Sequence, residues 1–359
     1  MKLKRDSRIR QAQLIIAGIV IPAIFVLAHE LAARQQTADV RSGFRRMITE
    51  EKPIWLTPAF ESTITVAAVG DLMMSSWIID VVRENGVDFP FDSTRHLLQS
   101  ADVAIANLEA PLTAEGERFA DKKYTFKVPP HFVDGIARAG FDVVTMANNH
   151  IADFGCEGIV NSIAALQGAG IHHCGAGRNI DEACAPTILD INGVKVAFLG
   201  FSMTYPEEFW ATRMRCGTCY PTEQLLYERI SEAERLADLT IVSFHWGAEK
   251  HHAPRAYQTA YGHYAIDFGA DLVLGHHPHV LQGVELYKGK LIAYSLGNYV
   301  FASYSPSART SMVLRAKIDR NGLIMAKIIP INVHNESINF QPAVHKGKMK
   351  QDVLEELNG

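Results

Sequence analysis

Three histidines stand directly after a short apolar run in the second half of the chain. The run Asp271–Gly275 has the composition of a buried strand, and it leads into His276, His277, Pro278 and His279. A glycine at a strand end permits a sharp turn, and a proline stiffens that turn. Imidazoles held close together are good ligands for divalent transition metals. The segment therefore predicts a metal site, and the alternative is that these are polar loop histidines.

Polar side chains also follow the ends of other predicted strands. Ligands of an α/β sheet gather beyond the carboxyl ends of its strands, so these side chains are expected to converge with the histidines. A single Asp or Asn after a strand more often caps a helix or forms a turn, but several consistent strand ends are hard to obtain by chance. The residues are Asp71, Asn107, Glu109, Asn148, Asn149, His150 and His245.

The predicted donor set is larger than one ion requires. A tetrahedral zinc takes about four ligands, whereas a larger set of oxygen and nitrogen donors suits two divalent ions that share a bridging carboxylate. Such a pair lowers the pKa of a bound water toward about 7 and holds the attacking and leaving oxygens of a phosphoryl group. The metal is left open among Mn, Fe, Zn and Mg. The predicted metal ligands are Asp71, Glu109, Asn149, His245, His277 and His279.

Other polar residues have predicted roles beside the metal. His150, next to a predicted ligand, is placed to protonate a leaving group as a general acid. A structural hydrogen bond to Asp153 is the alternative. Arg255, with Lys250 nearby, could hold an anionic polymer or a phosphate, or it could belong to a solvated helix start. The residues predicted to contact the substrate include Asn107, Asn148 and Arg255.

Short β-rich runs alternate with helical patterns from about residue 62 onward. This alternation is typical of a sheet flanked by helices, and after Gly275 the pattern changes to strands alone. The predicted strands are 64–69, 103–106, 143–147, 194–201, 239–244, 272–274, 283–287, 290–295, 311–318 and 322–329. The predicted helices are 131–139, 157–167, 222–237 and 256–268.

Basic residues precede an uncharged apolar run near the N-terminus. Residues 14–28 (LIIAGIVIPAIFVLA) have the layout of a signal anchor or of a cleaved secretory signal, and the anchor is favoured. We therefore predict a single-pass protein of the cytoplasmic membrane whose main domain is extracytoplasmic. The predicted divisions are an anchor at 1–33, a stalk at 34–61, the main domain at 62–303, C-terminal strands completing the sheet at 304–345 and an exposed tail at 346–359.

Composition narrows the class of protein. The chain has 359 residues, 48% of them apolar, which is enough for one large α/β domain or two smaller ones. Its net charge of −4 gives no sign of a concentrated basic face, so we predict that it does not bind nucleic acid. The five cysteines fit either compartment, but export would make Cys216 and Cys219 of the CGTC motif a candidate disulfide.

The motifs at these strand ends resemble those of the CapA/PgsA family of capsule and poly-γ-glutamate biosynthesis proteins, a branch of the calcineurin-like metallophosphoesterase superfamily. The resemblance implies a four-layer α/β/β/α metallophosphoesterase-like sandwich. It also implies a membrane-anchored role in the biosynthesis or export of an anionic polymer, with membrane-bound synthase or export subunits as partners. The motifs are VGDLMM (69–74), ANLEAPLT (106–113), MANNHIADFG (146–155), HWGAEKHHAP (245–254) and ADLVLGHHPHVLQGVELYKGKLIAYSLGNYVF (270–301).

The resemblance implies a role for each matching residue. Asp71 matches the opening metal aspartate and Glu109 the bridging carboxylate. Asn298 marks the rim of the site and is predicted to contact the substrate, and the alternative is that residues 295–298 form only a turn with Gly297 in a left-handed conformation. Asn149 matches the amide ligand, and His150 matches the acid. The three late histidines are matched by His245, His277 and His279. Spacing leaves open whether His276 or His277 is the ligand, and the pair with one residue between, His277 and His279, fits best.

The chain departs from typical phosphoesterases in two places. Asp71 is followed by Leu72 and Met73 rather than by a histidine two positions on, and the bridging position is a glutamate instead of an aspartate. Two hypotheses therefore compete. Either the chain is a metal-dependent hydrolase acting on an envelope phosphoester or amide, or it is a non-catalytic component that binds polymer or stabilises synthase subunits.

Overall fold

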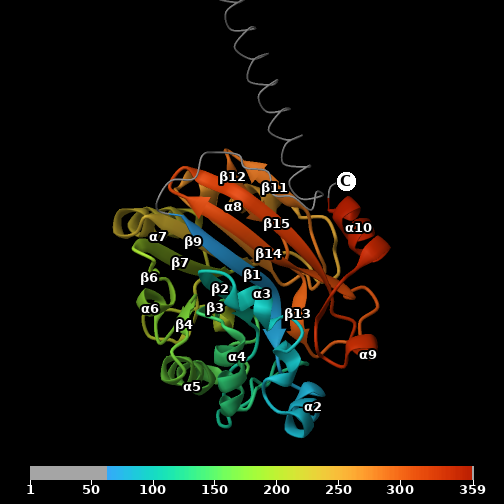
Figure 1. Cartoon of the computed structure of the whole chain (residues 1–359). Helices are drawn as coiled ribbons and strands as arrows, with labels where there is room; N and C mark the ends of the chain where they lie inside the picture. The colour runs from blue at the N-terminus through green and yellow to red at the C-terminus, as the bar shows by residue number, and fades with distance from the viewer. Residues whose placement is uncertain (1–62, 358–359) are drawn as a thin grey trace, which may run out of the picture. The chain divides into compact units, whose positions relative to one another are not determined.

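The computed structural model describes residues 63–357, and the predicted anchor and stalk lie outside these residues. Within the described residues, two β-sheets lie face to face and helices cover the outer side of each (Figure 1). In this part of the chain, none of the helices is long and apolar enough to cross a membrane. The described residues thus form a mixed α/β fold, as predicted.

The larger sheet has eight strands and carries the N-terminal half of the site. Its strands β1 to β4 are parallel, whereas β14 pairs with β1 in the antiparallel direction. In spatial order the strands are β16 (Ala343–Val344), β15 (Gly322–Asn332), β14 (Thr310–Asp319), β1 (Ile64–Met73), β2 (Val103–Leu108), β3 (Val143–Thr145) and β4 (His172–Cys174), with β13 (Asn298–Phe301) paired to the end of β1.

The smaller sheet has six strands and carries the late histidines. Its four central strands are parallel, and an antiparallel strand closes each edge. In spatial order the strands are β11 (Val284–Tyr287), β12 (Lys290–Ala293), β10 (Leu272–His276), β9 (Leu239–His245), β7 (Val194–Ser202) and β6 (Thr187–Ile191). A separate pair joins β5 (Ala176–Gly177) to β8 (Gly217–Thr218).

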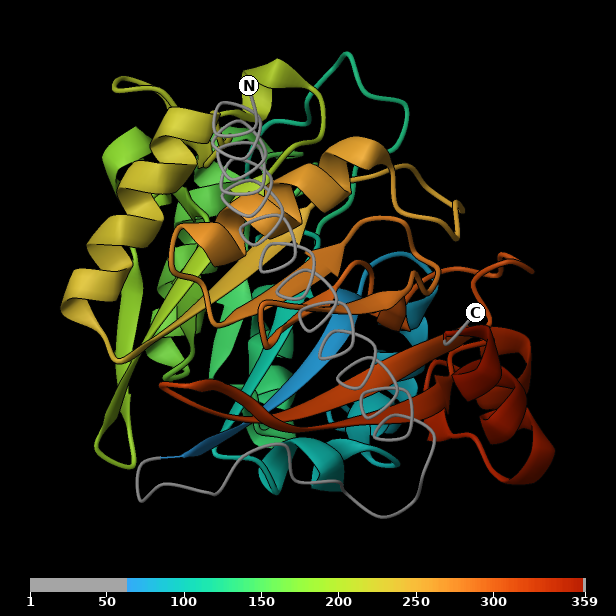
Figure 2. The same cartoon turned by 90° about the horizontal axis from the view of Figure 1, so that it is seen from above.

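Helices cover the outer faces because the strands present apolar side chains there. Ala67 and Val69 of β1 point to one face and pack against the helices α2 (Ile78–Asn85), α3 (Arg95–Gln99), α4 (Val133–Ala139) and α5 (Gly155–Gly168). On the smaller sheet, Val242 and Phe244 of β9 pack against α7 (Glu223–Leu236) and α8 (Ala256–Asp267), which are yellow and orange in Figure 2. The shorter helices are α6 (Ile180–Ala183), α9 (Asn335–Ile338) and α10 (Gly347–Glu356).

One prediction about the C-terminal part needs correction. The strands predicted after Gly275 are present: β11 and β12 join the smaller sheet, while β14, β15 and β16, the strands within 304–345, all join the larger one. The predicted exposed tail instead contains α10, which packs against β15. Val353 and Leu354 are 5% and 6% exposed, so this charged segment has one apolar side that the core covers.

The predicted Cys216–Cys219 disulfide is wrong. Cys216 is bonded to Cys156 and Cys219 to Cys184, with Cα atoms 5.3 and 5.1 Å apart. The physical reason is that the two residues between Cys216 and Cys219 form strand β8. Residues three apart along a strand are separated by about 10 Å and point to opposite faces, which is too far for a disulfide. Cys174 is free and buried.

Peptide mapping of the unreduced protein should recover both of these disulfides. Crosslinked peptides are expected to join Cys156 to Cys216 and Cys184 to Cys219, while Cys174 is alkylated after denaturation. Because the first bond closes a span of 60 residues, the double variant Cys156→Ser/Cys216→Ser should lose about 3 to 4 kcal/mol of unfolding free energy. A Cys216–Cys219 peptide would contradict the structure.

Candidate metal centre

The predicted site residues meet where the carboxyl ends of β1, β2, β3, β9 and β10 come together. Two glycines permit this approach. A Cβ atom on Gly70 would lie 1.8 Å from the carbonyl oxygen of Gly297, and one on Gly275 would lie 2.0 Å from that of Tyr294. Side chains larger than hydrogen are excluded at both positions, so the segment 294–297, which links β12 to β13, can pass close to the ends of β1 and β10.

The histidine turn after β10 has a strained backbone. His277 and His279 have φ values of 93° and 58°, in the left-handed region that residues with a Cβ rarely adopt. Asp71 holds this turn, because its Oδ2 accepts a hydrogen bond from the His277 backbone N–H at 3.3 Å and lies 3.0 Å from His279 Nδ1. Strain of this kind persists where the surroundings fix it, and it is concentrated at functional sites.

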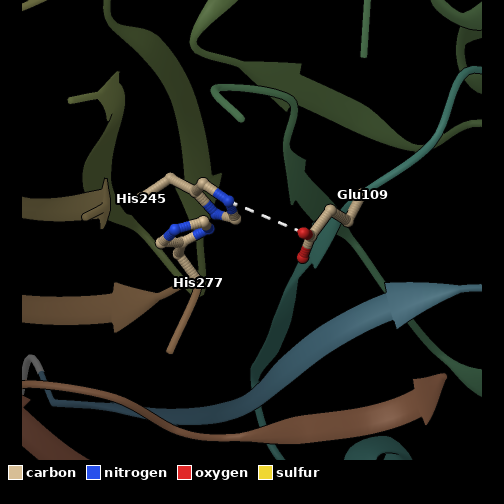
Figure 3. A group of neighbouring side chains, drawn as sticks. All are labelled: Glu109, His245 and His277. Carbon is tan, nitrogen blue, oxygen red and sulfur yellow. Dashed lines mark ion pairs between the residues drawn. The ribbon is translucent and has the colours of Figure 1, made fainter. Parts of the chain in front are cut away.

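The side chains form two groups that could each hold a metal ion. The first group is Asp71, Glu109 and His279, and the second is Glu109, His245 and His277. Within each group the ligand atoms lie within 4.8 Å of one another. Figure 3 shows the second group, in which His245 and His277 face Glu109 and His245 Nε2 lies 3.6 Å from Glu109 Oε1. Glu109 belongs to both groups, which is the arrangement expected of a bridging carboxylate.

Two further side chains lie close to these groups. Asn149, the predicted amide ligand, places its Oδ1 2.8 Å from His245 Nε2 in the second group. His276 places its Nδ1 3.2 Å from Asp71 Oδ1 in the first group. Both His276 and His277 therefore face the site, although spacing predicted a choice between them. His277 belongs to the second group, and His276 contacts the carboxylate of the first.

Buried polar atoms without partners show that this donor set fits a divalent ion. Glu109 Oε1, His276 Nε2 and His277 Nδ1 are buried and make no hydrogen bond. An unpartnered buried polar atom costs about 1 to 3 kcal/mol, and a cation would satisfy the carboxylate oxygen directly. Carboxylate, amide and imidazole donors in one buried cluster suit divalent transition metals.

Burial perturbs the titration of these groups. It raises the pKa of the Glu109 carboxyl well above its usual range, and the Asp71 charge raises it further. Burial alone would also raise the pKa of Asp71, but hydrogen bonds from His276 and His279 outweigh it and hold that pKa well below its usual range. Burial, and then the charge of His279, lowers the pKa of His277 to about 3. A neutral imidazole is the form that ligates metal.

Two of the residues predicted to contact substrate lie beneath the metal-binding side chains. Asn107 and Asn148 are both 0% exposed, so a substrate cannot reach them. Asn107 Nδ2 donates to Asp71 Oδ1 at 2.9 Å and to Glu109 Oε2 at 3.0 Å. Asn148 Nδ2 in turn donates to Asn107 Oδ1 at 3.0 Å. Asn107 and Asn148 therefore position the two carboxylates. Their predicted role as substrate contacts is wrong.

The other two predicted substrate contacts differ in position. Asn298 is buried, and its Oδ1 lies 3.0 Å from His279 Nδ1, so it orients that imidazole. Arg255 is exposed at the start of α8, where its backbone N–H donates to Gln258. Among the described residues, no hydrogen bond or ion pair joins Arg255 to the metal-binding groups. Its position agrees with the alternative reading of a solvated helix start.

His150 lies beside the metal-binding groups in a short network that sequence reasoning found only in part. Its Nδ1 is 2.7 Å from Asp153 Oδ2, and Lys122 Nζ donates to Asp153 Oδ1 at 2.7 Å. Lys122 Nζ also lies 2.9 Å from His150 Nδ1 and donates to the backbone carbonyl of Asn149. Burial lowers the pKa of His150, and the hydrogen bond to Asp153 offsets this in part. No local pattern marked Lys122, which lies in an irregular segment after β2.

A cavity of about 360 Å³ opens beside this network. His150 and His279 both line it, so a molecule in the cavity would touch the proposed acid and the first metal-binding group. Three cationic side chains, Lys122, Lys123 and Lys250, also line it, together with Glu249. The cavity therefore suits an anionic substrate, because its basic side chains outnumber its single carboxylate.

Comparison with known proteins gives matches along most of the chain. Residues 65–303 match the family model described as "Bacterial capsule synthesis protein PGA_cap". The chain is 33% identical over 281 residues to the capsule biosynthesis protein CapA of Bacillus anthracis, covering 76% of this chain and 68% of that protein. It is 29% identical over 341 residues to the PGA biosynthesis protein CapA of Bacillus subtilis (strain 168), covering 94% of this chain and 84% of that protein.

Solved structures give more distant matches. A hypothetical protein from Thermus thermophilus is 17% identical, with a TM-score of 0.48, and the match covers 75% of this chain and 99% of that protein. A likeness at this level has no bearing on function.

Proposed function

The chain belongs to the bacterial capsule synthesis protein family PGA_cap, and we propose that it acts in the biosynthesis or export of an anionic capsule polymer of the poly-γ-glutamate type. The names of the Bacillus relatives support this role. The observation that carries the proposal is that the family match spans the whole metal-binding cluster, from Asp71 to His279. The basic cavity beside that cluster suits a polymer of carboxylates.

We propose that the cluster holds two divalent ions. Asp71, Glu109 and His279 would hold the first, and Glu109, Asn149, His245 and His277 the second. His276 contacts Asp71 on the side of the first position, which lacks the histidine that usually follows this aspartate two positions on. Bound ions would supply Lewis-acid activation of a water molecule and of a substrate oxygen. Asn107 would keep both carboxylates in place by donating to each.

The position of His150 favours hydrolysis as the reaction. The chain would then be a metal-dependent hydrolase that acts on this polymer or on another envelope phosphoester or amide. Because Asp153 engages Nδ1, Nε2 is the ring nitrogen available to a molecule in the cavity. Asp153 fixes the orientation of the ring, and Lys122 ties that carboxylate to the segment after β2. Because Nδ1–H is donated to Asp153, Nε2 of neutral His150 would first accept a proton from the attacking water. The resulting imidazolium, stabilised by the Asp153 carboxylate, would then give that proton to the leaving oxygen or nitrogen.

We also propose that the domain works outside the cytoplasmic membrane, held there by an anchor at 1–33 and a stalk at 34–61. Two disulfides support this location, because disulfides persist in oxidising compartments. Membrane-bound synthase or export subunits would then be its partners, and they would deliver the polymer to the cavity.

Deleting the gene should abolish or strongly reduce surface polymer in the source cell. Glutamate released by acid hydrolysis of washed capsule measures it. Wild-type chain supplied from a plasmid should restore the polymer, as should the control variant Lys195→Gln, which changes an exposed residue far from the cluster in the sequence. An unchanged amount of polymer in the deletion strain would contradict the proposed function.

A further inference from the structure

A second cavity, of about 800 Å³, lies among α3, β15, β16 and α10. We call it the basic cleft. None of the residues that line it lines the cavity beside the metal-binding groups. Its lining includes three lysines, two histidines and no acidic side chain, in a chain whose net charge is −4. The basic side chains are His96, Lys327, His345, Lys346 and Lys350. Positive charge is therefore concentrated at this place against the overall balance of the chain.

The basic side chains come from separate elements that the fold brings together. His96 lies on α3 and Lys327 on β15, while Lys346 precedes α10, drawn in red in Figure 1. Lys327 and Lys346 are exposed. Among residues 63–357, no ion pair joins either of them to a carboxylate. Two cations in the lining thus lack an anionic partner within the described part of the chain.

The local sequence places further lysines beside the cleft. Lys346 and Lys350 are four residues apart at the start of α10, where like charges repel. The first turn of that helix has no acidic residue, and no side chain caps it. Cations at this end oppose the helix dipole. An anion in the cleft would relieve the repulsion among the lysines that β15 and the start of α10 contribute.

The remaining lining suits an extended chain better than a small ion. Leu97, Ile329 and Val344 add apolar side chains to the lining of the cleft. β16 ends the larger sheet, and within the described residues no strand pairs with its outer edge. We consider a polymer of amide-linked units, each with methylene groups and a carboxylate. Its carboxylates match the lysines, its methylene groups match the apolar lining, and its amides can pair with the open edge of β16.

We propose that the basic cleft binds a segment of a carboxylate-bearing polymer, separately from the metal centre. The proposal rests on the proposed function for its choice of polymer. The basic cleft would hold one part of a polymer strand while another part of the same strand enters the cavity beside His150. Linked contacts of this kind raise the effective concentration of the strand at the second site.

The test is fluorescence anisotropy with a labelled poly-γ-glutamate oligomer and the purified full-length chain at low salt. The double variant Lys327→Gln/Lys346→Gln should weaken binding about tenfold, because it removes two charge contacts. The matched control Lys195→Gln/Lys288→Gln removes the same charge elsewhere and should change affinity less than about twofold. Thermal midpoints should stay the same, since these residues are exposed. An oligomer with amidated carboxylates should not bind.

Equal binding by the double variant and the wild type would overturn the proposal, and so would an equal loss in the control. Vesicles containing anionic phospholipid provide another arm. If the lysines bind vesicles and not the oligomer, the cleft docks on a membrane and the polymer proposal fails. If polymer production in cells depends on the chain while the double variant binds normally, this inference fails and the proposed function stands. If the deletion strain makes normal polymer, the proposed function itself fails.

Discussion

Replacing His150 with alanine should lower hydrolysis of a phosphoester or of the polymer by about a hundredfold or more. The imidazole lines the cavity with Nδ1 held by Asp153, so Nε2 can take a proton from the attacking water and then give it to the leaving group. It belongs to neither metal-binding group. Metal content and thermal midpoint should therefore stay close to those of the wild type.

Turnover with a chromogenic phosphoester and with poly-γ-glutamate, measured beside metal content, checks this expectation. His131→Ala is the matched control, because His131 is exposed and outside the cavity lining, and it should keep full activity. If the wild type hydrolyses neither substrate and His150→Ala still supports polymer production in cells, the catalytic hypothesis fails. The metal centre would then have a binding role.

Replacing Glu109 with alanine should remove both metal ions. This carboxylate belongs to both groups, and its Oε1 is buried without a hydrogen-bond partner. Removing it takes one anionic ligand from each position at once. By contrast, His279→Ala should empty mainly the first position and His245→Ala mainly the second, because each belongs to one group.

The isosteric variant Glu109→Gln separates loss of ligand from loss of packing. An amide keeps the shape of the side chain and removes its charge, so the variant should fold and still bind metal poorly. If Glu109→Gln kept two ions per chain, the bridging assignment would be wrong.

The convergence of these side chains was largely predictable, because the proposed ligands follow apolar runs. Asp71 and His245 stand at strand ends that the sequence marks plainly, and parallel strands end on the same side of a sheet. The role of Asn107 was not predictable, because it depends on the register that sets Asn107 beside Asp71. Lys122 was missed because it reaches the site from an irregular segment, and no periodicity encodes such a contact.

The fold was predictable where patterns are long. Helices such as α7 and α8 appeared within a residue or two of their expected bounds, because their apolar positions recur at helical spacing. The division of the last strands between two sheets was not predictable, because the residue pattern of a strand does not indicate which strand it pairs with. The Cys156–Cys216 disulfide was also not predictable, because its two cysteines are 60 residues apart in sequence and only the tertiary fold brings them together.

Elemental analysis of the purified full-length chain, beside its Glu109→Ala variant, tests the metal centre most directly. After mild purification and reconstitution with Mn, Fe or Zn, the wild type should hold about two equivalents of divalent transition metal and the variant less than about 0.2. A wild-type chain that holds less than about 0.2 equivalents, and takes up none on reconstitution, would contradict the assignment of these strand-end side chains as metal ligands.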